Sequence, residues 1–144
     1  MRLNGYFKAG PLEAAYVTAV LAIPRLKIEQ RIEFLIDTGA TKTTILDKDA
    51  ITLGIPYSKL LRLKQRLLGL GGLVDTYVAN AEIYFKAESG QEHKELVEEL
   101  LVVKHRRVDE NIMRIPSVLG RDILNKYRLI YDKRSGLVAI ADES

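Results

Sequence analysis

One short run constrains this chain more than any other: an apolar stretch that ends in an acid and then in turn-forming residues. Residues Phe34–Ile36 are apolar, as in a buried strand, and are followed by Asp37-Thr38-Gly39-Ala40-Thr41. Because Gly39 permits a tight turn, the strand would deliver Asp37 into a loop. A carboxylate at the end of a core strand is costly to bury unless its charge is shared or neutralised. Asp37 is therefore a candidate for chemistry.

The same residues also have an ordinary explanation, since Asp, Thr and Gly all favour turns. A second segment bears on the choice between a plain turn and a catalytic loop. Residues Pro116–Leu124 contain the apolar pair Val118-Leu119, then Gly120, then Arg121-Asp122 at the start of an expected helical turn. Alone, this segment would be interpreted as a generic junction between a strand and a helix.

Together and in this order, Asp37-Thr38-Gly39-Ala40 and Leu119-Gly120-Arg121-Asp122 resemble the two signature motifs of the retropepsin-like aspartic peptidases, the single-domain relatives of pepsin. The resemblance extends from about Tyr16 to about Ile140. It implies an all-β fold: a closed acid-protease barrel that corresponds to one half of pepsin, with one or two short helices. It also implies that residues 1–144 form a single domain.

Length and composition agree with one globular domain. A chain of 144 residues can bury a substantial core, and 47% apolar content is typical of folded proteins. No apolar run approaches the ~20 residues of a membrane span, and Met1–Tyr6 lacks the apolar core of a signal peptide. We therefore expect no membrane association and a cytoplasmic location. The absence of cysteine excludes disulfides, thiol catalysis and thiolate metal sites.

Charged residues give no sign of a nucleic-acid or metal site. The net charge is +3, and the densest basic run, Lys104-His105-Arg106-Arg107, is followed by Asp109 and Glu110. No aromatic residue interrupts that run as a stacking platform would require, so we interpret it as a solvated loop. Neither His93 nor His105 has a partner at metal-ligand spacing, and we expect both on the surface. We expect no metal, no cofactor and no nucleic-acid partner.

The rest of the chain reads mostly as short strands between turns, which favours an all-β barrel or sandwich. Asp47 is a plausible N-cap for a short helix that runs to about Leu53 and ends at Gly54. The expected strands are Tyr16–Ile23 and Lys27–Ile36 (a hairpin around Pro24–Leu26), Thr43–Ile45, Leu61–Leu70, Leu73–Phe85, Lys94–Val103, and a final hairpin of Tyr127–Asp132 and Gly136–Ala141, with a turn at Ser89–Gln91 and a loop at Ile112–Ile115.

The resemblance assigns roles by position in the motifs. Asp37, Thr38 and Gly39 would be the catalytic residues: Asp37 acts on the water, Thr38 hydrogen-bonds across a dimer, and Gly39 lets the substrate backbone approach and offers its carbonyl. Ala40 would leave room beside Asp37. Ala40 and Thr41 would also border the substrate.

One position departs from the family pattern. Retroviral members often carry Asp at the position of Thr41, where it contacts both the substrate and the motif arginine. Arg121, which with Gly120 would support the active-site loop through an ion pair, therefore needs another partner in this chain. Asp122 is a possible one.

A glycine-rich run provides a candidate substrate cover. Leu70, Gly71 and Gly72 resemble the tip of a retropepsin flap, a hairpin that folds over the bound peptide and would make these residues substrate-binding. A plain hairpin turn remains the alternative. The run lacks the Gly-Lys-Ser/Thr ending of a phosphate-binding loop.

The chemistry implied by the resemblance needs two carboxyl groups that share a proton across a bound water. This chain has one Asp-Thr-Gly, since Asp75-Thr76 is followed by Tyr77. We therefore expect a homodimer in which Asp37 faces its own copy across a two-fold axis, with Met1–Lys8 and Gly136–Ala141 pairing in a shared sheet. The expected activity is that of an aspartic endopeptidase on peptide or protein substrates. A non-catalytic dimer of the same fold that binds extended peptides by strand addition remains the alternative.

Overall fold

The computed structural model describes residues 1–9, 13–63 and 73–142. Within them the chain is mostly β, as the sequence predicts, with two short helices, α1 (Asp47–Leu53) and α2 (Arg121–Leu124). Neither described helix is long and apolar enough to cross a membrane. The strands are β1 (Arg2–Asn4), β2 (Tyr6–Lys8), β3 (Ala14–Ile23), β4 (Ile28–Ile36), β5 (Thr44–Ile45), β6 (Leu61–Arg62), β7 (Val74–Lys86), β8 (Glu92–His105), β9 (Val118–Leu119), β10 (Arg128–Asp132) and β11 (Leu137–Ala141), with single 3-10 turns at η1 (Pro24–Leu26), η2 (Tyr57–Lys59) and η3 (Ile112–Arg114).

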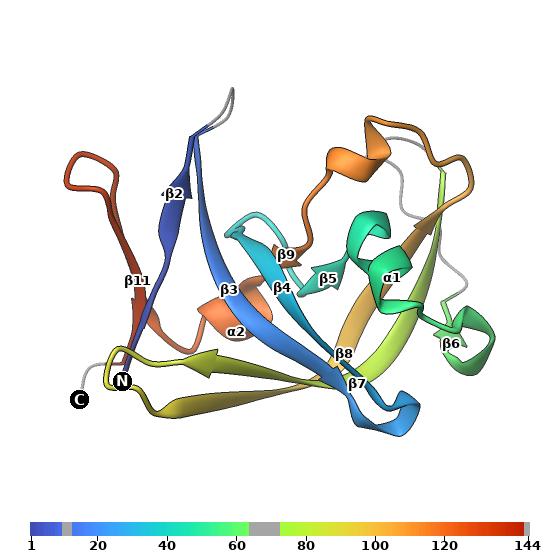
Figure 1. Cartoon of the computed structure of the whole chain (residues 1–144), viewed down its shortest axis with the longest axis horizontal. Helices are drawn as coiled ribbons and strands as arrows, with labels where there is room; N and C mark the ends of the chain where they lie inside the picture. The colour runs from blue at the N-terminus through green and yellow to red at the C-terminus, as the bar shows by residue number, and fades with distance from the viewer. Residues whose placement is uncertain (10–12, 64–72, 143–144) are drawn as a thin grey trace.

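The larger sheet runs in the order β2-β3-β4-β9-β5-β8-β7-β6. A further antiparallel pairing places Leu21 of β3 opposite Ile83 of β7. Because of this pairing, the strands from β3 round to β7 form a closed ring (Figure 1). The ring is compatible with the closed barrel that the sequence resemblance implies.

Alternation of residue type along the strands decides which side chains fill this ring. In β4, Ile32 and Phe34 are buried, whereas Arg31 is exposed and Glu33 is half-buried. Full burial of a side chain such as Phe34 stabilises the fold by roughly 1.5–3 kcal/mol. The largest side chains of the core that are almost fully buried come from β1, β3, β4, β5, β7, β8, β9 and α2, and include Leu3, Leu21, Ile23, Ile32, Phe34, Ile45, Ile83, Phe85, Leu100, Leu119 and Ile123.

The two best-defined local predictions are confirmed. β3 and β4 pair antiparallel around η1, as expected for the first hairpin. Helix α1 covers the predicted residues and ends at Gly54, which has a left-handed backbone with φ of +66°. One detail is wrong: Leu46, not Asp47, is the N-cap residue of α1. The Asp47 carboxylate accepts a hydrogen bond from the backbone N–H of His105 instead.

Most predicted strand ends differ from the structure by one or two residues, and three departures stand out. Strand β6 covers only Leu61–Arg62 of the predicted Leu61–Leu70, of which residues 64–70 lie outside the described part of the chain. Strand β8 extends beyond the predicted Lys94–Val103 at both ends. The loop expected at Ile112–Ile115 contains the 3-10 turn η3.

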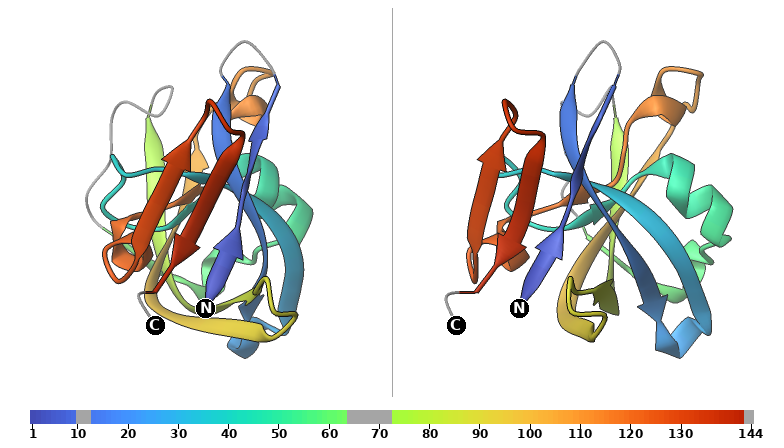
Figure 2. Two further views of the ribbon diagram at one scale, coloured as in Figure 1. Left: turned by 90° about the vertical axis from the view of Figure 1, so that its left-hand side faces the viewer. Right: turned by 60° about the vertical axis from the view of Figure 1, so that its left-hand side comes forward.

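A second, three-stranded sheet joins the two ends of the described chain in the order β1-β11-β10. Leu3 lies opposite Ile140 in antiparallel register, and both are buried. Figure 2 shows this sheet standing beside the β2–β3 hairpin, with the first residues and the end of β11 close together. Of the segments expected to pair in a shared sheet of a dimer, β1 already pairs with β11 within one chain, whereas β2 pairs with β3. The shared sheet stays a prediction.

Candidate active site

The fold brings the two sequence motifs into direct contact. Strands β4 and β9 lie side by side in parallel, with Leu35 opposite Val118 and Ile36 opposite Leu119. The backbone N–H of Asp37 donates to the Leu119 carbonyl at 3.0 Å, which continues the ladder one residue past β4. Asp37 therefore stands where both motif strands end; the sequence predicts its place after the first of them.

The loop after β4 is a tight turn around the Asp37 carboxylate. The N–H of Gly39 donates to Asp37 Oδ1 at 2.9 Å, and the N–H of Ala40 donates to the Asp37 carbonyl at 3.2 Å. A Cβ atom on residue 39 would lie 3.1 Å from Asp37 Oδ1, tighter than ordinary van der Waals contact, so Gly39 suits this position. Within the described part of the chain, Asp37 Oδ2 makes no hydrogen bond. One oxygen of a half-buried carboxylate is thus fixed and the other is left open.

Arg121, the first residue of α2, holds this loop in place with hydrogen bonds. The N–H of Arg121 donates to the Ala40 carbonyl at 2.8 Å, and its guanidinium donates to the Thr38 carbonyl at 2.8 Å and to Thr41 Oγ1 at 3.2 Å. The ion pair expected for Arg121 is replaced, among the described residues, by these carbonyl and hydroxyl acceptors. Gly120 permits the close approach, because a Cβ there would lie 2.6 Å from the Lys42 carbonyl carbon.

Asp122 is not the partner of Arg121, so that suggestion is wrong. Its carboxylate accepts hydrogen bonds from the Thr43 N–H at 3.0 Å, from the Thr43 hydroxyl at 2.7 Å and from the Ile123 N–H at 2.9 Å. The Thr43 hydroxyl oxygen also accepts from the Gly120 N–H at 3.1 Å. Thr43 is fully buried and was missed as a site residue, because the sequence marks it only as the start of a short strand.

An apolar row borders Asp37 on the same face of the sheet. Leu35 lies two residues before Asp37, so both side chains point to one side of β4. Val118 of β9 and Tyr16 of β3 lie opposite Leu35 on the two neighbouring strands. All three are half-buried, in contrast to the buried core on the other face.

The predicted substrate cover falls in the sequence between β6 and β7. Leu70, Gly71 and Gly72 lie outside the described residues. The chain on either side of them is anchored by β7 and β8: the Leu63 N–H donates to the Thr76 carbonyl at 2.8 Å, and the Leu73 carbonyl accepts from the Arg106 N–H at 3.2 Å. The flap assignment therefore stays a prediction.

Both histidines depart from the expected surface position. His105 is 2% exposed, because β8 extends into the basic run as far as His105 and carries this side chain inward, where Nδ1 is hydrogen-bonded to Asp47 Oδ1. His93 is half-buried, with Nε2 3.0 Å from the hydroxyl of Tyr127 and 3.3 Å from the carboxylate of buried Glu95. The interpretation of residues 104–107 as a loop is thus wrong for the first two residues, which belong to β8.

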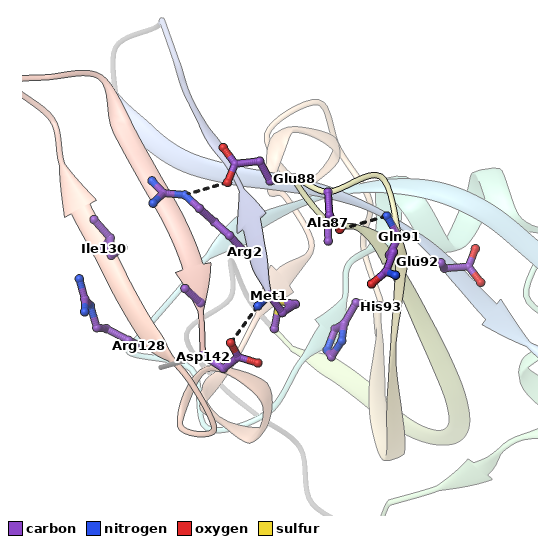
Figure 3. A pocket seen from close by; sticks show the side chains of 12 residues that line it. Met1, Arg2, Ala87, Glu88, Gln91, Glu92, His93, Arg128, Ile130 and Asp142 are labelled. Carbon is purple, nitrogen blue, oxygen red and sulfur yellow. Dashed lines mark hydrogen bonds and ion pairs between the residues drawn. The ribbon is translucent and has the colours of Figure 1, made fainter. Parts of the chain in front are cut away.

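A pocket of about 670 Å³ lies apart from this loop, between the ends of the chain and the β7–β8 turn (Figure 3). The Met1 amino group is paired with Asp142 at 2.9 Å, and Arg2 lies 3.9 Å from Glu88. None of the site residues predicted from the sequence lines it. Because these charged groups are paired with each other and no motif residue lines the pocket, we do not assign it as the catalytic centre.

Comparisons with known proteins agree with the geometry. A family model described as aspartyl protease matches residues 25–122, more than half of the chain. No protein in the curated set that was searched matches. The crystal structure of a retropepsin-like aspartic protease from Rickettsia conorii is similar, with a TM-score of 0.57, 19% sequence identity and coverage of 96% of this chain and 98% of that one. EIAV protease in complex with the inhibitor HBY-793 has a TM-score of 0.47, 18% identity and coverage of 83% and 92%. At 19% identity, the likeness to the Rickettsia conorii structure shows the fold alone, which is retropepsin-like. The family match shows the class: this chain belongs to the aspartyl protease family.

Proposed function

We propose that the chain is an aspartic endopeptidase that acts as a homodimer, with Asp37 and its copy on a second chain forming the catalytic pair. The observation that carries this proposal is the loop of Asp37: one carboxylate oxygen is held by the Gly39 N–H and the other is open within the described residues. The family assignment supports peptide hydrolysis as the reaction class. The single Asp-Thr-Gly per chain supports the need for a second copy.

In this proposal the two carboxyl groups share one proton, because two like charges so close cannot both ionise. The ionised group takes a proton from a water molecule, and the resulting hydroxide attacks the scissile carbonyl carbon. The protonated group donates its proton to the carbonyl oxygen, which gives a tetrahedral diol. The C–N bond then breaks as the proton taken from water passes to the leaving amine nitrogen, and one diol proton returns to the other carboxyl group. Gly39 keeps Asp37 oriented, and Arg121 keeps the loop in place through the carbonyl of Thr38.

Neighbouring residues fit the remaining roles. The side chain of Thr38 is exposed, so its hydroxyl is available to a second copy. The Thr38 carbonyl is bound by Arg121. The half-buried row of Leu35, Val118 and Tyr16 supports a preference for apolar side chains next to the cleaved bond. Ala40 and Thr41 border the same loop and would contact the substrate backbone.

Hydrolysis of a denatured protein at acidic pH tests the proposal. Asp37→Asn should lower the rate by more than ~100-fold, because Asn keeps the shape of Asp but can act neither as acid nor as base. Asp132→Asn, at the last residue of β10, is the matched control and should cleave normally. Circular dichroism should be unchanged in both variants. Cleavage that survives Asp37→Asn would remove the assignment.

A further inference from the structure

The face of the sheet that carries Asp37 continues onto two tyrosines. Strands β2, β3, β4 and β9 lie side by side in that order (Figure 1). Tyr6 of β2 lies opposite Tyr16 of β3. Leu35 of β4 lies opposite Tyr16 on one side and opposite Val118 of β9 on the other. Because side chains at opposite positions of neighbouring strands point to the same face, these four half-buried residues form one row.

Three contacts fix the ring of Tyr6 at the end of this row. The ring stacks on that of Tyr16, with 6.4 Å between the centroids and an interplanar angle of 22°. The Tyr6 hydroxyl donates to the Glu33 carboxylate and lies 2.6 Å from the Thr18 hydroxyl. The Lys8 ammonium pairs with Glu33 at 2.7 Å and lies over the Tyr16 ring. We call Tyr6 and Tyr16 the tyrosine pair. Because its rings are already held in place, little conformational freedom is lost when a ligand contacts them.

Strand β2 reaches this face because the chain changes sheets at Gly5. The Gly5 N–H donates to the Val138 carbonyl of β11 at 2.8 Å. A Cβ on residue 5 would lie only 2.5 Å from the Tyr16 carbonyl oxygen, so glycine lets the chain pass this close to β3. Phe7 points to the opposite face of β2 and contacts Tyr131 of β10, with 5.2 Å between the ring centroids. The two faces of β2 thus carry separate aromatic contacts.

The apolar surface beside Asp37 continues across the strands and not along β4. Beyond Leu35, the next residue of β4 on the same face is Glu33, whose carboxylate is bound by Lys8 and Tyr6. Across the strands, Leu35 is followed by the two rings of the tyrosine pair. A peptide that leaves Asp37 over Leu35 therefore keeps apolar contact when it runs toward β2.

The spacing of the row matches that of an extended peptide. The first and third residues on one side of a cleaved bond point the same way and lie ~6.6 Å apart. Neighbouring strands lie ~4.8 Å apart, so Tyr16 and Tyr6 lie roughly 5 and 10 Å from Leu35 along the row. A peptide that places its first side chain over Leu35 therefore places its third over the tyrosine pair.

We propose that the tyrosine pair selects an aromatic side chain at the third residue on each side of the bond that the peptidase cleaves. This inference rests on the proposed function, because it takes Asp37 as the place of the cleaved bond. An aromatic side chain can stack on, or meet edge-on, a ring that is already fixed. In a two-fold dimer each chain supplies the same row to one half of the peptide, so the preference should hold on both sides.

Matched peptide substrates test the preference. The first two peptides differ only in carrying Phe or Ala as the third residue before the cleaved bond, and a second two differ only at the third residue after it. In both sets the parent protein should cleave the Phe peptide with a kcat/KM about tenfold higher than that of the Ala peptide. Equal kcat/KM values in the parent protein would overturn the proposal.

Variants of β2 locate the source of this ratio. Tyr6→Ala should reduce it to about twofold, whereas Tyr6→Phe keeps the ring and should retain most of it. A loss of folded protein lowers the rates for both peptides by the same factor, so it does not change the ratio. Tyr131→Ala is the matched control, because its ring contacts β2 from the opposite face. An unchanged ratio in Tyr6→Ala, or an equal fall in Tyr131→Ala, would exclude the tyrosine pair.

Nuclear magnetic resonance separates this inference from the proposed function and needs no change at Tyr6. With the Phe peptide bound to Asp37→Asn protein, nuclear Overhauser contacts should join the peptide ring to the rings of Tyr6 and Tyr16 but not to that of Tyr131. These contacts without any cleavage by the parent protein would mean that the peptidase assignment had failed while the tyrosine pair still bound the peptide. Cleavage by the parent without these contacts would overturn the inference and leave the proposed function standing.

Discussion

The guanidinium of Arg121 makes two directed hydrogen bonds to the loop that carries Asp37. One goes to the Thr38 carbonyl at 2.8 Å and the other to Thr41 Oγ1 at 3.2 Å. Lysine would keep the positive charge, but its ammonium group cannot reproduce the planar fork. The shape of the loop therefore depends on the geometry of Arg121 more than on its charge.

Arg121→Lys should lower kcat for peptide cleavage strongly and should reduce the unfolding free energy only slightly. The lost hydrogen bond is worth about 1 kcal/mol of unfolding free energy, whereas a displaced carboxylate slows every turnover. Denaturant unfolding and steady-state kinetics measure the two effects. Arg128→Lys, at an exposed position of β10, is the control. A wild-type kcat in Arg121→Lys would show that the fork has no positioning role.

Gly120 has no space for a side chain, since a Cβ would lie 2.6 Å from the Lys42 carbonyl carbon and 2.9 Å from the Thr43 nitrogen. Gly120→Ala should lower the unfolding free energy by about 1–3 kcal/mol, because backbone atoms must move to accept the methyl group. Chemical denaturation monitored by circular dichroism measures this change. A loss below about 0.5 kcal/mol would mean that the loop rearranges easily.

Local sequence was enough to predict that Asp37 follows a strand and that Arg121 opens a helical turn after Gly120, because these placements follow from neighbours in the chain. It was not enough to find the partners of Asp122 and Asp47. Thr43 is 79 residues from Asp122, and His105 is 58 residues from Asp47. Such contacts depend on strand register, which no local pattern encodes.

At the scale of elements, a charged network joins β2, β3 and β4. Tyr6 is hydrogen-bonded to Glu33 and to Thr18, and Lys8 is paired with Glu33 at 2.7 Å. Burial raises the pKa of Glu33, but the hydrogen bonds from Lys8 and Tyr6 outweigh burial and hold it below its ordinary value of 4.5. As the pH falls, Glu33 therefore becomes protonated at a lower pH in the folded chain than in the unfolded chain.

The sign of this shift predicts an acid-dependent stability. The contribution of Glu33 is fully present above its ordinary pKa of 4.5 and is lost as the pH falls below that value toward the lowered folded pKa. Glu33→Gln should therefore be less stable than the parent at neutral pH and should lose less stability on acidification. Urea unfolding over this pH range measures it, with exposed Glu29→Gln as control. Parallel pH curves for parent and variant would contradict the prediction.

The β3–β4 hairpin could be predicted from the sequence, whereas the end of β8 could not. Alternation in residues 28–36 is a local signal, and the β3–β4 hairpin follows from it. The end of β8 is different: Lys104 and His105 look like a solvated loop, yet pairing with Asp75 and Val74 makes them a strand. Tertiary pairing overrides local propensity there, as is common in sheets.

At the scale of the whole molecule, the proposed chemistry needs two chains. Specific activity should fall on dilution as dimers separate into chains with a single Asp37 each. Thr38→Ala should shift this fall to higher protein concentration, since each side loses a hydrogen bond worth about 1 kcal/mol. Sedimentation velocity run beside the activity assay measures both. A monomer with full activity would exclude the dimeric mechanism.

The antiparallel β1–β11 pair has a mechanical consequence. Arg2 lies opposite Ala141, and the Met1 amino group is only 2.9 Å from Asp142, so a force applied to these two ends acts across neighbouring rungs of one ladder. Under such a load the rungs would open one after another, like a zipper, and would not have to break together. A molecule pulled by its ends would then lose β1 and β11 at low force, while the ring of strands around Asp37 would still be closed.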